Sequence, residues 1–70
     1  MVKDCRILLK RTDTGLFYQA PNNWVVHRQD ASAFENSMRA IYFCKEHNFK
    51  DIVILMDFGK SEYDVILNIG

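Results

Sequence analysis

The sequence predicts a small α+β domain with the order strand, strand, helix, strand, strand, in which one helix covers one face of a four-stranded mixed sheet. Three observations predict it. Apolar and polar residues alternate near both ends of the chain, the middle changes to a helical period, and a nearly continuous apolar run, Ile52–Phe58, lies between them. A chain of 70 residues has room for one thin hydrophobic core. We therefore expect a single domain over residues 1–70.

The N-terminal part predicts a β-hairpin followed by a short extended piece. Side chains alternate between apolar and polar over 5–10, and Thr12–Gly15 supplies turn residues before a second strand at Leu16–Tyr18. Pro21 ends that strand, because proline cannot donate a hydrogen bond to a neighbouring strand. Trp24–Val26 then predicts a short extended piece.

One helix is expected between Asn36 and Asn48. Ala40 and Cys44 fall on one face at helical spacing. Asn36 or Ser37 can cap the first turn with a side-chain oxygen. Asn48 suits the left-handed conformation in which many helices end.

The C-terminal part predicts a second hairpin. Ile52–Phe58 is apolar on both alternation phases, which is typical of a central strand. Gly59–Glu62 supplies a turn, and alternation over 63–69 predicts the last strand. A right-handed crossover would place the first and third strands side by side, in the order 2-1-3-4.

Charge and hydropathy exclude several classes of partner. Nine Lys and Arg balance nine Asp and Glu, so no general attraction draws the chain to phosphate backbones or anionic lipids. No apolar run is long enough to span a bilayer, and the first residues lack a secretory signal. We expect a cytoplasmic protein with neither a nucleic-acid nor a membrane partner.

The cysteines and histidines do not predict a metal site. Cys5, Cys44, His27 and His47 are scattered along the chain, whereas zinc sites use closely paired ligands. We expect two reduced, buried thiols and no metal or cofactor. Cys44 and His47 share a helical face, which leaves a small thiol-dependent enzyme as the alternative function. Cys44 also lies on the predicted core face, where a thiol is inert.

No other catalytic pattern stands out in the sequence. Its carboxylates are not paired at a spacing suited to acid and base catalysis, and its three glycines are isolated. We therefore predict that the protein is not an enzyme.

The sheet face away from the helix is the predicted interaction surface. One helix can cover only one face, and four aliphatic residues fall on the alternation phase opposite to the core. Such a patch marks an association site, and two-fold pairing with a second copy is the simplest way to bury it. The function expected is a protein-interaction module, homodimeric ahead of binding a foreign protein. The predicted interface residues are Leu8, Val53, Leu55 and Ile66.

Two aromatic residues, Trp24 and Phe34, are predicted core positions. Trp24 stands beside a turn with other aromatic residues, and core packing is favoured over an interface there. The chain also resembles a group of small bacterial proteins and terminal domains of unknown function. They share a Thr-Gly-x-Tyr-like strand, a tryptophan a few residues later and an Ala-x-x-Phe step into a helix. The resemblance implies packing roles for Trp24, Phe34 and Ala40, and no activity, cofactor or partner. The residues that carry it are Asp13–Tyr18, Trp24, Ala31, Phe34, Ser37 and Ala40.

The element order, with a glycine at the end, is also similar to the β-grasp of ubiquitin-like carriers. That resemblance implies a carrier function through Gly70, a second alternative. Such carriers end in Gly-Gly on a flexible tail, whereas here a single glycine follows strand-like residues. Likeness of fold does not establish function.

Overall fold

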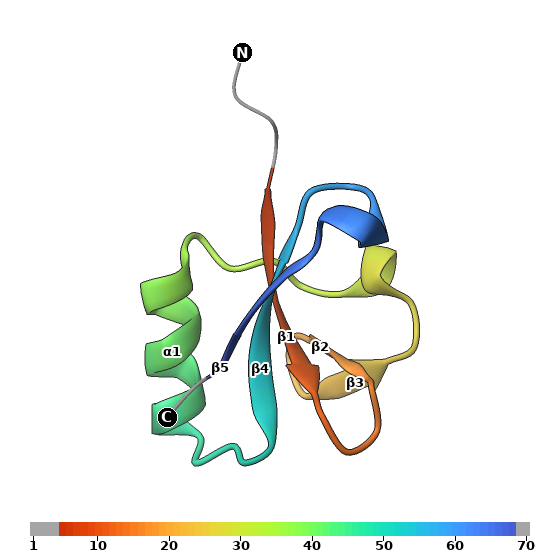
Figure 1. Ribbon diagram of the computed structural model, residues 1–70. Coiled ribbons are helices and arrows are strands. Elements are labelled where there is room, and N and C mark those ends of the chain that lie inside the picture. The colour runs from red at the N-terminus through yellow and green to blue at the C-terminus, as the bar shows by residue number, and fades with distance from the viewer. Residues whose placement is uncertain (1–4, 69–70) are drawn as a thin grey trace.

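A five-stranded antiparallel sheet carries one α-helix on one of its faces (Figure 1). The computed structural model describes residues 5–68. The strand order is β3-β2-β1-β4-β5, and α1 packs on the central strands β1 and β4. Two short 3-10 helices, η1 and η2, lie on the other side of the sheet (Figure 1). The elements are β1 (Arg6–Arg11), β2 (Phe17–Gln19), β3 (Asn23–Val25), η1 (Arg28–Asp30), α1 (Ser37–Glu46), β4 (Ile52–Asp57), η2 (Ser61–Tyr63) and β5 (Val65–Asn68).

The α+β class with one α-helix is confirmed, but the sheet differs from the predicted one in two ways. It has five strands instead of four, because the extended piece around Trp24 pairs with β2 as an edge strand. It is antiparallel throughout instead of mixed. Since β1 is antiparallel to both neighbours, β2 and β4 run in the same direction on either side of it. The predicted order of the other four strands is found as β2-β1-β4-β5.

Local sequence chemistry explains the first turn and both ends of α1. Gly15 has a φ of 77°, a conformation that costs glycine little, and its N–H donates to the carbonyl of Arg11 at 2.9 Å. The Asn36 side chain accepts a hydrogen bond from the N–H of Arg39 at 2.9 Å and caps the helix. The helix ends at Glu46, and Asn48 takes the expected left-handed conformation with a φ of 55°.

The core between α1 and the sheet centres on Tyr18. Its ring lies 5.5 Å from that of Trp24 and 6.3 Å from that of Phe34, measured between centroids. Trp24 and Phe34 are half-buried and pack against this core. The buried members of the cluster are Ile7, Leu9, Tyr18, Ala40, Cys44, Ile52 and Ile54.

A second, smaller core lies on the opposite face of the sheet, which we call the second face. Leu8 and Leu55, direct partners on β1 and β4, pack there with Phe17 and Ala31. Ala31 follows η1, so the segment that joins β3 to α1 covers this part of the sheet.

Candidate interaction surface

The predicted interface on the second face is covered by the chain itself. Leu8 and Leu55 are 0 % and 1 % exposed, and Val53 is also buried. Only Ile66, at 54 %, is accessible to a partner. The alternation phase placed these side chains on the second face correctly, but the expectation that the face is open was wrong.

Two arginines hold the covering segment in place. Arg6 on β1 donates from Nη1 to the carbonyl of Arg28 at 3.1 Å and from Nη2 to the carbonyl of Ala31 at 2.6 Å. The carbonyl of Arg28 also accepts from the N–H of Ala31 at 3.1 Å, and Arg6 gives the Ala31 carbonyl a partner as the segment crosses the sheet. These hydrogen bonds fix Ala31 above Leu8 and Leu55.

Arg28 ties the same segment to β4 and to the start of β5. Its Nη1 and Nη2 donate to the two oxygens of Asp64 at 2.9 and 2.8 Å, and Nη1 also donates to Asp57 Oδ1 at 3.1 Å. Asp57 is buried and accepts a further hydrogen bond from the N–H of Gly59 at 2.9 Å. Paired arginine and carboxylate groups of this geometry are strong and directional. No periodic pattern in the sequence predicts this cluster, because Asp57 and Asp64 lie 29 and 36 positions from Arg28.

The Arg28 cluster makes the stability of the protein sensitive to acid. Hydrogen bonding from Arg28 holds the pKa of Asp64 below its ordinary value. The stabilisation is therefore complete above the unfolded pKa of about 3.9 and is lost as the pH falls through the lower folded value. Asp64→Asn should lower the free energy of unfolding at neutral pH and flatten its fall below about pH 5.

Urea unfolding over a pH series measures this effect, with Glu35→Gln as the control that removes an exposed carboxylate. An Asp64→Asn protein with the acid dependence and neutral stability of wild type would show that the pair contributes nothing.

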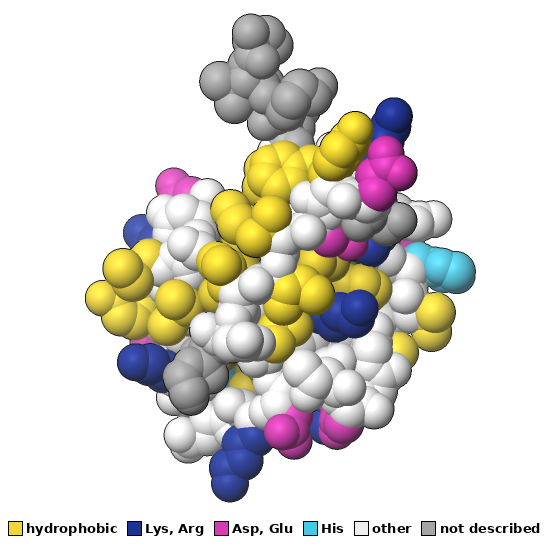
Figure 2. All heavy atoms as spheres, in the orientation of Figure 1, with side chains coloured by type: hydrophobic (Ala, Val, Ile, Leu, Met, Phe, Trp, Pro, Cys, Tyr) yellow, Lys and Arg dark blue, Asp and Glu magenta, His cyan; other side chains and the backbone are white. Residues whose placement is uncertain are grey.

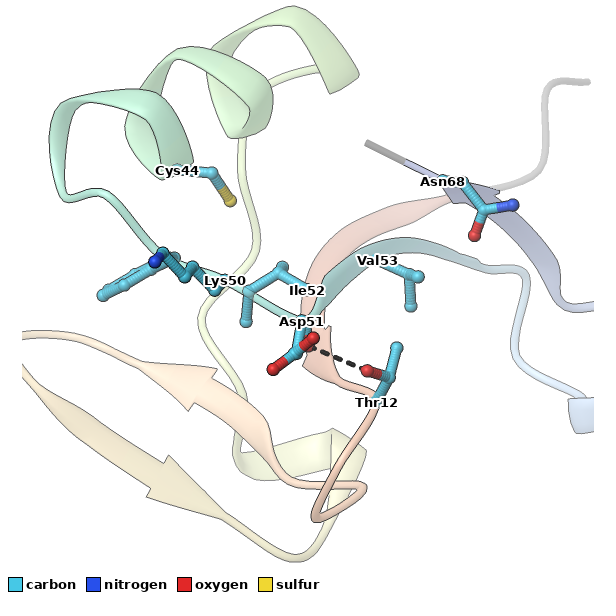
Figure 3. A pocket seen from close by; sticks show the side chains of 8 residues that line it. Thr12, Cys44, Lys50, Asp51, Ile52, Val53 and Asn68 are labelled. Carbon is cyan, nitrogen blue, oxygen red and sulfur yellow. Dashed lines mark hydrogen bonds between the residues drawn. The ribbon is translucent and has the colours of Figure 1, made fainter. Parts of the chain in front are cut away.

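Cys44 lies beneath a surface hollow at the C-terminal end of α1. Figure 3 shows its sulfur pointing from the helix toward the sheet, with Lys50 and Asp51 at the rim. Burial raises the pKa of the Cys44 thiol, which favours the unreactive protonated form. The ring of His47 stacks 4.1 Å from that of Phe43, between centroids, and its Nδ1 lies 3.0 Å from the Phe43 carbonyl oxygen.

The two thiols should differ in reactivity. Cys44 is buried and Cys5 is half-buried. In native buffer we expect Cys44, isolated in a Cys5→Ser variant, to react with a thiol reagent at least about tenfold more slowly than in denaturant. Cys5 in a Cys44→Ala variant should react faster than Cys44. Equal rates for native and unfolded Cys44 would restore the thiol enzyme as a competing function.

The part of the chain that the structure describes contains neither a cluster of metal ligands nor a helix that could span a membrane. Among residues 5–68, no three His, Cys, Asp or Glu side chains gather as a metal-binding group. No helix of this described part is long and apolar enough to cross a membrane. Gly70, on which the carrier alternative depends, lies outside the described residues.

Strand β5 carries three of the seven large hydrophobic residues that are exposed in the described chain. Val65, Ile66 and Leu67 are 42 %, 54 % and 38 % exposed, and β5 is the last strand of the sheet, paired only with β4 in the described chain. Ile66 lies opposite Leu55 and so shares the second face, whereas Leu67 lies opposite Ile54 on the helix face. Figure 2 shows hydrophobic side chains along β5 and over α1. We call Val65, Ile66 and Leu67, with the outer backbone of their strand, the β5 edge.

The other edge of the sheet is protected in ways that β5 is not. β3 has only three residues and follows Pro21 and Asn22. A short strand and a nearby proline are common protections of edge strands against pairing. The Val-Ile-Leu-Asn sequence of β5 is one residue longer and contains neither proline nor a charged side chain.

Three further large apolar side chains are exposed on η2 and α1. Tyr63 in η2 comes just before β5. Met38 and Tyr42 are one turn apart on α1, on the same side of the sheet as Val65 and Leu67. Together with the β5 edge they account for six of the seven large hydrophobic residues that are exposed in the described chain.

Comparison with known proteins does not assign this fold to a family. No family model matches the chain, and neither a curated protein nor a solved structure matches it. The resemblance to small bacterial proteins and the similarity to β-grasp carriers therefore stay predictions.

Proposed function

We propose that this protein is a non-enzymatic interaction module that self-associates through the β5 edge. The observation that carries the proposal is the run of three exposed aliphatic residues on an edge strand. Removing apolar surface from water contributes roughly 25 cal/mol for each Å². The outer N–H and C=O groups of an edge strand can also pair with a further strand.

The character of the β5 edge favours a protein partner. Strand β5 contains no Lys or Arg that could contact a phosphate backbone, and its exposed side chains are aliphatic. The raised pKa of Cys44 favours a packing role for that thiol over a nucleophilic one. Both features support the interaction module over the thiol-dependent enzyme.

A lysine at the centre of the β5 edge tests the proposal. Ile66→Lys removes exposed apolar area and brings two like charges together in a symmetric pair, so we expect association to weaken by at least about 100-fold. Sedimentation of wild type and variant at matched concentrations measures the change, and circular dichroism checks the fold.

The matched control is Val26→Lys, which changes an exposed aliphatic residue just after β3, at the other edge of the sheet. It should associate as wild type does. A folded Ile66→Lys protein with wild-type association would refute the β5 edge as the contact.

A further inference from the structure

We infer that two copies pair antiparallel along β5 with Ile66 opposite Ile66 of the second copy, which joins their sheets into one continuous sheet. The inference rests on the proposed function and specifies its geometry. It depends on three features of the β5 edge: its unpaired backbone, its pattern of side chains and its lack of net charge.

Among residues 5–68, the backbone of β5 is paired on one side only. Each central strand has two neighbours, whereas β5 pairs with β4 alone in the described chain. In an edge strand, part of the N–H and C=O groups point outward, and a second strand can satisfy them with ladder hydrogen bonds. A second β5 supplies a strand of the same length.

The side chains select one register. Directly opposed residues of an antiparallel pair share a face of the sheet, so a two-fold axis perpendicular to the sheet places one residue opposite its own copy. With Ile66 at the axis, Val65 lies opposite Leu67, and all three opposed pairs are aliphatic. With Leu67 at the axis, Ile66 would lie opposite the polar Asn68. The first register matches apolar residues at all three positions from Val65 to Leu67.

Charge does not oppose this pairing. The strand Val65–Asn68 contains no ionisable side chain, and the whole chain has no formal net charge. Asp64, just before the strand, would lie opposite Asn68 of the second copy. Its carboxylate is already paired with Arg28, at 2.8 and 2.9 Å. Two copies can therefore approach without like charges facing each other.

The area available indicates a weak dimer. Two four-residue strands alone bury less than the roughly 1,200 Å² at the lower end of stable interfaces. Tyr63 precedes the strand, and Met38 and Tyr42 are exposed on α1, the helix on the same side of the sheet as Val65 and Leu67. Since these side chains can add to the contact, we expect self-association at micromolar concentrations.

Disulfide trapping between two different variants tests the register. In a Cys5→Ser background, Val65→Cys and Leu67→Cys chains of distinguishable length are mixed and treated with a mild oxidant. Opposed residues have Cβ atoms about 4.5–5.5 Å apart and diagonal residues about 7–8 Å. A disulfide needs about 3.5–4.5 Å. The mixed disulfide should therefore form at least about tenfold faster than either homodimeric one.

The outcomes separate the register from the proposed function. Faster trapping of Leu67→Cys with itself would place the axis at Leu67 and overturn the Ile66 register. Association in sedimentation without preferential trapping in the mixture would overturn strand pairing in the Ile66 register, whereas contact through the β5 edge is tested separately by Ile66→Lys. A monomeric wild type at high micromolar concentration would overturn both. Circular dichroism of each cysteine variant confirms that the fold is retained.

Discussion

Replacing Leu55 by lysine is expected to abolish the fold. Leu55 is 1 % exposed and lies between Leu8 on β1 and Ile66 on β5 in the register of the sheet. Burying an unpaired ammonium group there costs several kcal/mol, which is comparable with a total stability of about 5 kcal/mol for so small a domain. Circular dichroism and thermal unfolding should show no cooperative transition for Leu55→Lys.

The matched control is Ile66→Lys, one strand further along the same row of the second face. It should unfold cooperatively, because the lysine reaches solvent at this edge. A cooperatively folded Leu55→Lys protein would mean that the segment after η1 does not cover the second face.

The second large effect is expected at Tyr18. Tyr18 is 4 % exposed, and its ring lies 5.0 Å from that of Phe43 and 5.5 Å from that of Trp24, between centroids. Truncating a buried aromatic residue leaves a cavity as well as losing contacts, so Tyr18→Ala should cost about 3 to 5 kcal/mol. Urea unfolding measures it.

Tyr42→Ala, at an exposed position on α1, is the control and should change the free energy of unfolding by less than about 0.5 kcal/mol. A loss below about 1 kcal/mol for Tyr18→Ala would show that the aromatic cluster does not anchor β2 and β3 to the helix side.

Residues whose conformation depends on near neighbours were predicted well from sequence. Asn36 and Asn48 mark the ends of α1 because a cap acts within one turn of its own position. Gly15 marks the first turn for the same reason. Alternation also assigned Leu8 and Leu55 to the correct face of the sheet.

Which segment covers the second face depends on tertiary contacts, and the alternation of apolar and polar residues does not predict them. The covering segment around η1 is polar in sequence, His27-Arg28-Gln29-Asp30, and shows no apolar period. It is held by Arg28 to Asp64, which lies 36 positions away. A buried Leu55 and a surface Leu55 therefore have the same sequence pattern, and only the tertiary contact distinguishes them.

The directions of the strands and the presence of a fifth strand also depend on contacts between strands, which a local sequence pattern does not show. β3 is three residues long, too short for a period of two to be recognised, and it becomes a strand by pairing Trp24 with Tyr18. The right-handed crossover rule concerns parallel strands, whereas β1 is antiparallel to β2 and β4. The rule therefore did not apply to the pair for which it was used.

The exposed aliphatic residues of β5 indicate a contact at the edge of the sheet, whereas the sequence predicted a contact through the second face. Because the second face is covered, we expect association at the β5 edge. There, hydrogen bonds between backbones stabilise the contact in addition to the burial of apolar side chains. Ile66 is the one predicted interface residue that belongs both to the second face and to the β5 edge. Its neighbours Val65 and Leu67 were expected together on the core-facing phase of the last strand. They are instead 42 % and 38 % exposed, because β5 lies at the edge of the sheet.

The most direct measurement of self-association through the β5 edge is the molar mass of the wild-type protein in solution over a concentration series. Sedimentation equilibrium from low to high micromolar concentration should show the mass rising from the 8.2 kDa of one chain toward twice that value. Ile66→Lys should stay at the mass of one chain over the same range. A wild-type mass of one chain at every concentration would contradict self-association.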